Sequence, residues 1–121
     1  MINKAKNWGD FLGSMKWNFI ATFRPHYKLK EGTVHMLGKR LIKNSKFKKV
    51  FYALESDRSD NHKHLHLIMD VSGNMDSKEL AKALKTNPKS VGYVDKVRSK
   101  DAVSRYVTKH LSHVEVYDLL C

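Results

Sequence analysis

His62-Lys63-His64-Leu65-His66-Leu67-Ile68-Met69-Asp70 is the stretch that decides the fold of this chain. Histidine recurs at every second position of its first half, and an apolar run follows directly. In an extended strand alternate side chains point to the same face, so the histidines share one face of the predicted strand. The other face carries Leu65, Leu67, Met69 and Val71. Such a strand can bind a metal ion on one face and pack a hydrophobic core on the other.

Strands and helices alternate on either side of this stretch. Runs rich in aromatic and β-branched residues predict strands, and apolar residues at helical spacing predict helices. The predicted strands are residues 17–23, 49–55, 62–71, 90–97 and 114–117. The predicted helices are residues 33–43, a short helix that begins at Asp76 or Ser77 and ends near residues 87–88, and a last helix from Asp101 to His110 or Leu111. Residues 1–16 show little pattern and are expected to form either a loose N-terminal arm or a short helix.

The resulting order, β-α-β-β-α-β-α-β, predicts an α+β fold of the ferredoxin-like kind, an antiparallel sheet with helices on one face. Helices that cover Leu65 and Leu67 would leave the histidines on the opposite, open face of a central strand. The chain has 121 residues, no internal repeat and no linker rich in Pro or Gly. A single domain over residues 1–121 is therefore expected.

The chain is strongly basic, with 23 Lys and Arg against 12 Asp and Glu and a formal net charge of +11. This balance favours a polyanionic partner such as nucleic acid, with an acidic membrane surface as the alternative. No apolar stretch approaches the roughly 20 residues that a membrane span needs, and the N-terminus lacks the apolar core of a signal peptide. A soluble intracellular protein is expected. Because Cys121 is the single cysteine, any metal must be held by His and carboxylate.

Glu55 ends the predicted strand that precedes the histidines. Across a hairpin its carboxylate is expected beside His62 or His64, either directly or diagonally. Two imidazoles and one carboxylate form an open site suited to Mg²⁺ or Mn²⁺, with free positions for water or phosphate oxygens. The alternative is that alternating His and Lys only decorate a solvated strand, and composition does not decide between the two.

The last predicted helix contains a second group of reactive side chains. Lys109 and His110 follow Tyr106 by three and four residues, so the three side chains share one helix face and can converge on one phosphate. A phenolate can attack phosphorus, but a tyrosine with its ordinary pKa of about 10 is a weak nucleophile and needs a metal or a cation such as Lys109. The alternative is an amphipathic helix with a packed tyrosine and a solvated lysine.

Three segments occur along the chain in the order Phe19-Ile20-Ala21-Thr22-Phe23-Arg24-Pro25, His64-Leu65-His66 and Tyr106-Val107-Thr108-Lys109. In this order, and on these predicted elements, they resemble the three motifs of the HUH endonucleases. The resemblance is specifically to the single-tyrosine rolling-circle replication initiators, or Rep proteins, of small plasmids, phages and single-stranded DNA viruses. It covers residues 17–117.

The resemblance implies a chemical role for the residues of the second and third motifs. His64 and His66 would ligate a divalent metal, Mg²⁺ or Mn²⁺, with Glu55 as the acidic residue that completes the site. Tyr106 would attack the DNA, assisted by Lys109.

Further residues are candidates for contacts with DNA. The first motif is linked to origin recognition, which implies a role for Phe19 and Thr22 in shaping the DNA-binding face, and Thr22 equally suits a structural strand residue. Arg24 is a further candidate for DNA binding. His62 has no fixed counterpart in the family, and His110 shares the helix face of the tyrosine; both are further candidates. The basic residues expected to contact phosphates are Lys39, Arg40, Lys43, Lys96, Arg98, Lys100 and Arg105.

The same resemblance implies nicking and joining of single-stranded DNA at a replication origin, through a 5′-phosphotyrosine that leaves a 3′-hydroxyl for a polymerase. The expected substrate is a hairpin loop or melted origin, and the expected partners are the polymerase and helicase of the host or virus, with no membrane. With one motif tyrosine, concerted strand exchange requires either a second subunit or a second encounter, so a homodimer is one expectation. The compartment would be the cytoplasm of a prokaryotic host or the nucleus of a eukaryotic one.

Two other functions fit parts of the pattern. An HUH transposase or relaxase shares the histidine pair, although the short basic chain and the motif around Thr22 fit a replication initiator better. A noncatalytic nucleic-acid-binding module on a ferredoxin-like fold needs stacking aromatics on its central strands, where this chain has His64 and His66.

Overall fold

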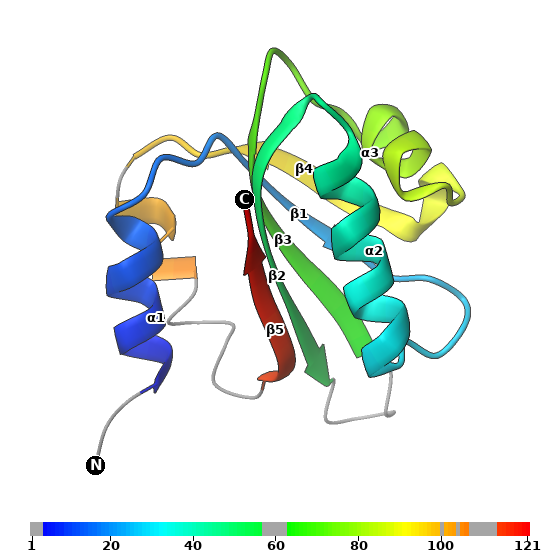
Figure 1. Ribbon diagram of the computed structural model, residues 1–121, viewed down its shortest axis with the longest axis horizontal. Coiled ribbons are helices and arrows are strands. Elements are labelled where there is room, and N and C mark those ends of the chain that lie inside the picture. Colours follow the sequence, from blue (N-terminus) through cyan, green and yellow to red (C-terminus); the bar gives the residue numbers. More distant parts are fainter. Residues whose placement is uncertain (1–3, 57–62, 100, 104, 107–113) are drawn as a thin grey trace.

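The computed structural model of the chain describes residues 4–56, 63–99, 101–103, 105–106 and 114–121. Its helices and strands follow one another in the predicted order (Figure 1). They are helix α1 (Lys4–Gly13), strand β1 (Phe19–Phe23), helix α2 (Glu31–Lys43), strand β2 (Phe47–Ser56), strand β3 (Lys63–Val71), helix α3 (Ser77–Leu84), the 3-10 turn η1 (Pro88–Ser90), strand β4 (Val91–Lys96) and strand β5 (Val114–Leu120). Residues 101–103 and 105–106 are helical as well. Of the two forms expected for the N-terminal segment, the structure has the helix.

The five strands form one antiparallel sheet in the order β4-β1-β3-β2-β5. The predicted α+β class is thus confirmed, and β3, which carries the histidines, is the central strand. The first four positions of this order, β4-β1-β3-β2, belong to the β-α-β-β-α-β unit, and β5 adds a strand beside β2. A central strand is paired on both sides, so its register is fixed by two neighbours at once.

The main hydrophobic core lies between the sheet and helices α2 and α3, which Figure 1 shows on one side of the strands. Alternate residues of β3 point into it, as the sequence predicts, because these residues are the apolar ones. The fully buried members from the three inner strands and the two helices include Ala21, Phe23, Val34, Leu37, Leu41, Tyr52, Leu65, Leu67, Met69, Leu80 and Leu84. This layer fixes which face of β3 turns away from the helices.

The opposite face of the sheet, expected to be open, is partly covered by helix α1 and by residues 101–103 and 105–106 (Figure 1). The physical reason is that Phe51 and Ile68 point to this face and need apolar cover. Trp17 supplies part of it and is held in place by a hydrogen bond from its Nε1 to the Leu12 carbonyl oxygen, 2.7 Å away. This second buried cluster consists of Leu12, Trp17, Phe51, Ala53, Ile68 and Val103.

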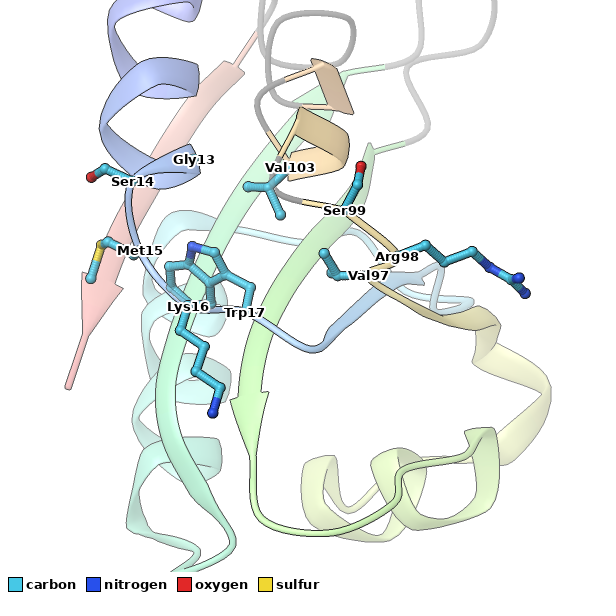
Figure 2. Close-up of a pocket in the computed structure, with 9 residues that line it drawn as sticks. All are labelled: Gly13, Ser14, Met15, Lys16, Trp17, Val97, Arg98, Ser99 and Val103. Atoms are coloured by element: carbon cyan, nitrogen blue, oxygen red, sulfur yellow. The ribbon is translucent and has the colours of Figure 1, made fainter.

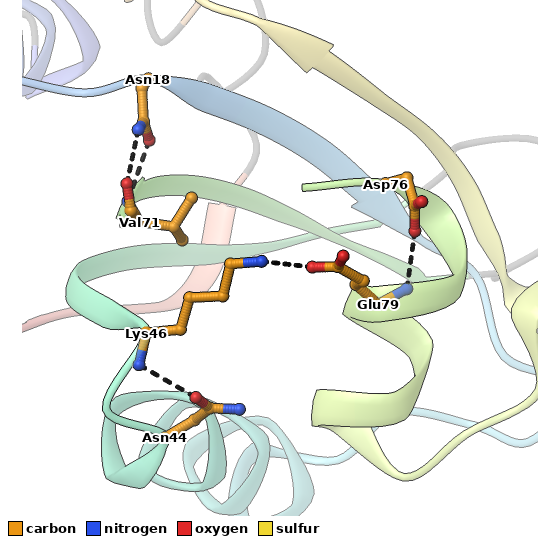
Figure 3. Close-up of polar contacts among 6 residues, drawn as sticks. All are labelled: Asn18, Asn44, Lys46, Val71, Asp76 and Glu79. Carbon is orange, nitrogen blue, oxygen red and sulfur yellow. Dashed lines mark hydrogen bonds and ion pairs between the residues drawn. The ribbon is translucent and has the colours of Figure 1, made fainter. Parts of the chain in front are cut away.

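Polar side chains fasten the ends of the strands and the start of α3 (Figure 3). The amide of Asn18 donates to the Val71 carbonyl at 2.7 Å and accepts from the Val71 backbone N–H at 2.9 Å, which ties the entry of β1 to the end of β3. Asp76 caps α3 by accepting from the Glu79 backbone N–H at 2.8 Å, as the sequence predicts. An ion pair between Lys46 and Glu79 joins the start of β2 to α3. Within the described parts of the chain, none of the helices is long and apolar enough to span a membrane.

Helix α2 approaches β2 closely at Gly38. The ring of Tyr52 is buried against this glycine, and a Cβ atom placed on Gly38 would lie 2.2 Å from Tyr52 Cε1. The Tyr52 hydroxyl is fixed in turn by a 2.6 Å hydrogen bond with His35 Nδ1. The ring therefore cannot move aside without losing both its packing and its polar partner.

We expect Gly38→Ala to destabilise the fold by about 1 to 3 kcal/mol, because the added methyl group overpacks the contact with Tyr52. Gly32→Ala is the matched control: Gly32 lies in the same helix, and a Cβ there meets no atom within 4 Å. This control should leave stability unchanged or raise it by about 0.5 to 1 kcal/mol. Urea unfolding followed by circular dichroism measures both, and equal effects of the two substitutions would contradict the packing argument.

Burial of Tyr52, with the Asp118 carboxylate nearby, raises its pKa from 10.0 to about 12. The unfolded chain loses this proton at its ordinary pKa, while the folded chain keeps it. The free energy of unfolding should therefore fall as the pH rises from 10 to 12, and the contribution is fully present below pH 10. We expect Tyr52→Phe to show a smaller fall over this range in urea unfolding; equal falls would show that Tyr52 is not the titrating group.

Candidate active site

Glu55, His64 and His66 meet on the face of the sheet opposite α2 and α3. Glu55 and His64 are direct cross-strand partners in β2 and β3, and His66 follows two residues later on the same face of β3. His64 Nε2 lies 3.4 Å from Glu55 Oε1, and His66 Nε2 lies 3.5 Å from Glu55 Oε2. The structure thus brings together the three residues that the sequence nominates as metal ligands, with Glu55 directly opposite the first histidine.

The three side chains suit a small divalent cation. Their ligand atoms all lie within 4.8 Å of one another. Two atoms that are each about 2.1 Å from one ion lie about 3.0 to 3.4 Å apart, depending on the coordination angle, which is close to the two nitrogen–oxygen distances above. Imidazole nitrogen and carboxylate oxygen are both ordinary ligands of Mn²⁺-type and Zn²⁺-type ions. The three residues could therefore hold a metal ion.

Both histidines are buried, whereas the sequence suggests an exposed strand face. His64 is 7% exposed and His66 is 3% exposed. The two rings meet edge to face, with centroids 4.7 Å apart, so each covers part of the other. Cover also comes from the segment that carries Tyr106, which packs against the second apolar cluster beside Val103. Solvated decoration of the strand, the alternative left open by composition, is inconsistent with this burial.

Tyr106 lies directly against His66. Its hydroxyl is hydrogen-bonded to His66 Nδ1, and the two rings meet edge to face with centroids 5.4 Å apart at 78°. The other ring nitrogen of His66, Nε2, is the one that faces Glu55. The imidazole of His66 therefore connects Tyr106, the predicted nucleophile, with Glu55, another predicted metal ligand. The three residues come from three different parts of the chain.

The surroundings of the Tyr106 hydroxyl favour its neutral form. Burial is the main cause that raises the pKa of Tyr106 well above its ordinary value, and Tyr93 and the Glu55 carboxylate raise it further. Thr22, which faces His66 across the β1–β3 pair, acts in the opposite direction through its hydroxyl. Thr22 is itself buried, so its place is inside the site rather than on an outer DNA-binding surface. The phenolate of Tyr106 is therefore disfavoured at neutral pH.

The predicted arginine contacts are exposed and lie at the margins of this arrangement. Arg24 follows the end of β1, where its backbone N–H donates to Ser90 O at 2.7 Å. Arg105 adjoins Tyr106 in the chain and is exposed. Arg98 is on the rim of a cleft of about 470 Å³ whose lining includes Trp17 and Val103, and Figure 2 shows its side chain pointing away from them.

Other predicted residues are separated from the site or fall outside the described residues. Lys39, Arg40 and Lys43 belong to α2, which covers the opposite face of the sheet, so they cannot contact the phosphate that Tyr106 would reach. The predicted site residues that lie outside the described part of the chain are His62, Lys100, Lys109 and His110.

Tyr93 is the member of the site that sequence reasoning missed. It lies in β4, directly opposite Thr22, and its hydroxyl donates to the Tyr106 hydroxyl at 3.5 Å. The signal in the sequence is weak, because a tyrosine in an alternating strand is ordinary. Its position follows from the pairing of β4 with β1, two strands that are far apart along the chain.

No family model matches the chain, and neither a curated protein nor a solved structure matches it. The chemistry of the site is therefore the basis for assigning a function.

We expect His64→Ala and His66→Ala each to weaken Mn²⁺ binding by more than about tenfold, because each removes one of three protein ligands. Titration calorimetry or the electron paramagnetic resonance signal of free Mn²⁺ measures this without any substrate. His35→Ala is the control, since His35 lies on α2 behind the sheet and should leave Mn²⁺ binding unchanged. Mn²⁺ affinity that survives both substitutions in β3 would refute the metal site.

Proposed function

We propose that this chain is a metal-dependent endonuclease and strand transferase that acts on single-stranded DNA with Tyr106 as its nucleophile, in the manner of the HUH replication initiators. One observation carries the proposal: the Tyr106 hydroxyl is bonded to one nitrogen of His66 while the other nitrogen faces Glu55. A nucleophile, two imidazoles and a carboxylate in this arrangement fit phosphoryl transfer better than a purely structural cluster.

His66 would position and activate the nucleophile. When Nε2 donates its lone pair to a cation, the remaining proton of the neutral ring sits on Nδ1. Nδ1 then donates to the Tyr106 oxygen, and this hydrogen bond favours the phenolate over the phenol. Thr22 supports the same state, because its hydroxyl lowers the pKa of Tyr106. The residues thus counteract the burial that holds Tyr106 neutral in the absence of a cation.

The proposed reaction transfers one phosphoryl group. Tyr106 gives up its phenolic proton to solvent, its oxygen forms a bond to phosphorus, and the bond from phosphorus to the 3′-oxygen breaks. That oxygen takes up one proton from solvent to become a free hydroxyl, so the number of protons is unchanged over the step. A divalent ion held by Glu55, His64 and His66 would supply polarisation of the phosphate and compensation for its growing negative charge. Attack by a 3′-hydroxyl on the phosphotyrosine runs the step backwards, so the same residues join strands without ATP.

The charge of the chain supports a nucleic-acid substrate. A formal net charge of +11 attracts phosphates, and Arg105, which is exposed and next to Tyr106 in the chain, can contact them. Since the nucleophile is largely buried, the substrate strand must be unpaired to reach it, as in a hairpin loop or a melted origin. We propose initiation of rolling-circle replication, with a polymerase extending the free 3′-hydroxyl, as the process that this chemistry serves inside the host cell.

Tyr106→Phe should abolish covalent attachment of the protein to DNA while leaving binding largely intact, because it removes only the attacking oxygen. The measurement is a denaturing gel of the protein incubated with single-stranded hairpin oligonucleotides and Mg²⁺ or Mn²⁺. Tyr117→Phe is the matched control, a tyrosine on the same face of the sheet, and it should form the adduct normally. EDTA, His64→Ala and His66→Ala should each prevent adduct formation.

Three outcomes decide between the functions that the sequence allows. An adduct that persists in Tyr106→Phe contradicts the assignment of the nucleophile. Binding without any adduct, under all metals tried, favours the noncatalytic nucleic-acid-binding module. Cleavage confined to transposon-end hairpins favours the transposase.

A further inference from the structure

Tyr93 is an aromatic side chain on the edge of the sheet that borders the nucleophile. It lies in β4, in one cross-strand row with Thr22 of β1 and His66 of β3, so the three side chains point to the same face. Its hydroxyl donates to the Tyr106 hydroxyl at 3.5 Å, yet the residue is 38% exposed. Tyr93 therefore reaches from the buried centre of the site to its solvent-exposed rim.

The position of the ring determines what it meets when a DNA strand binds. A phosphate that Tyr106 attacks must come into contact with the Tyr106 oxygen. A nucleotide attached to that phosphate then lies within reach of the exposed part of the Tyr93 ring. Aromatic side chains beside a single strand provide stacking surfaces that accept any base, because every base has a π-face.

We infer that Tyr93 is a base-stacking contact for the single strand, at the nucleotide beside the phosphate that faces Tyr106. The inference rests on the proposed function for its substrate, but it concerns the recognition of a base rather than the chemistry at phosphorus. The ring of Tyr93, rather than its hydroxyl, provides the binding surface.

Tyr117 offers an internal comparison. It lies in β5 at the other edge of the sheet, opposite Ala53, which is opposite His66, so it belongs to the same cross-strand row as Tyr93. It is 43% exposed, close to the value for Tyr93. Four strand spacings of about 4.8 Å separate the two edges by roughly 19 Å. Tyr117 thus matches Tyr93 in residue type, face and exposure, but the two lie at opposite edges of the sheet.

The test compares binding to two strands of equal charge. One is an oligonucleotide of about twenty deoxythymidines, and the other is an abasic strand of the same length with the same phosphates. Affinities are measured by fluorescence anisotropy in EDTA, so that no cleavage takes place. The ratio of the two affinities reports base contacts alone, because the phosphate contacts are common to both strands.

We expect Tyr93→Leu to reduce this ratio about tenfold and to leave the affinity for the abasic strand unchanged. The unchanged affinity for the abasic strand also shows that the variant is folded. Tyr93→Phe keeps the ring and should keep the wild-type ratio, as should the control Tyr117→Leu. An unchanged ratio in Tyr93→Leu, or an equal loss in Tyr117→Leu, would overturn the inference.

A cross-linking experiment locates the contact directly. Replacing one thymine in the oligonucleotide by 5-iodouracil and irradiating the complex joins the base to an adjacent aromatic ring, and mass spectrometry identifies the peptide. We expect the joined residue to be Tyr93, and a cross-link only to Tyr117 would refute the assignment. If Tyr93→Leu lowers the ratio of affinities but no adduct forms in the hairpin assay, the result supports the stacking contact and contradicts the nuclease. If an adduct forms but Tyr93→Leu leaves the ratio of affinities unchanged, the result supports the nuclease and contradicts the stacking contact.

Discussion

The register of β3 between its two neighbours is the constraint on which the rest of the structure depends. Pairing with β2 sets Glu55 opposite His64, and pairing with β1 sets Thr22 opposite His66. A shift of either pairing by one residue would turn the histidines into the hydrophobic core and bring Leu65 to the site face. The packing of α2 and α3 on the apolar residues of β3 therefore also fixes the candidate site, so core and site share one geometric origin.

The burial of this site carries a cost that the apolar core does not. The two imidazoles are buried and Glu55 and Tyr106 are partly buried, and polar groups withdrawn from water in this way cost free energy unless they are compensated. Groups of this kind in a partly buried cluster with a strongly shifted tyrosine pKa are typical of sites that bind ions or perform chemistry. A cation bound between the Glu55 carboxylate and the two histidines would compensate part of that cost, which couples metal binding to the stability of the sheet.

The sequence predicts those parts of the structure that depend on local pattern. The alternation in β3, the cap at Asp76 and the hairpin that brings Glu55 to His64 all follow from residues close together in the chain. The burial of the histidines does not, because it depends on the packing of α1, Val103 and Tyr106 over Phe51 and Ile68. Tyr93 was missed for a related reason: the pairing of β4 with β1 joins strands separated along the chain by two strands, two helices and a 3-10 turn, and no local pattern encodes it.

The hydroxyl of Tyr106 has a further consequence for how the protein behaves between encounters with a substrate. A buried phenol that keeps its proton is a poor nucleophile, so it does not react with stray electrophiles or metabolites in the surrounding solution. Reactivity would appear only when cation and phosphate are present together. Selectivity would then depend on when the nucleophile becomes reactive as well as on the shape of the site. The Tyr106 hydroxyl would stay unreactive until the cation and the phosphate are both bound.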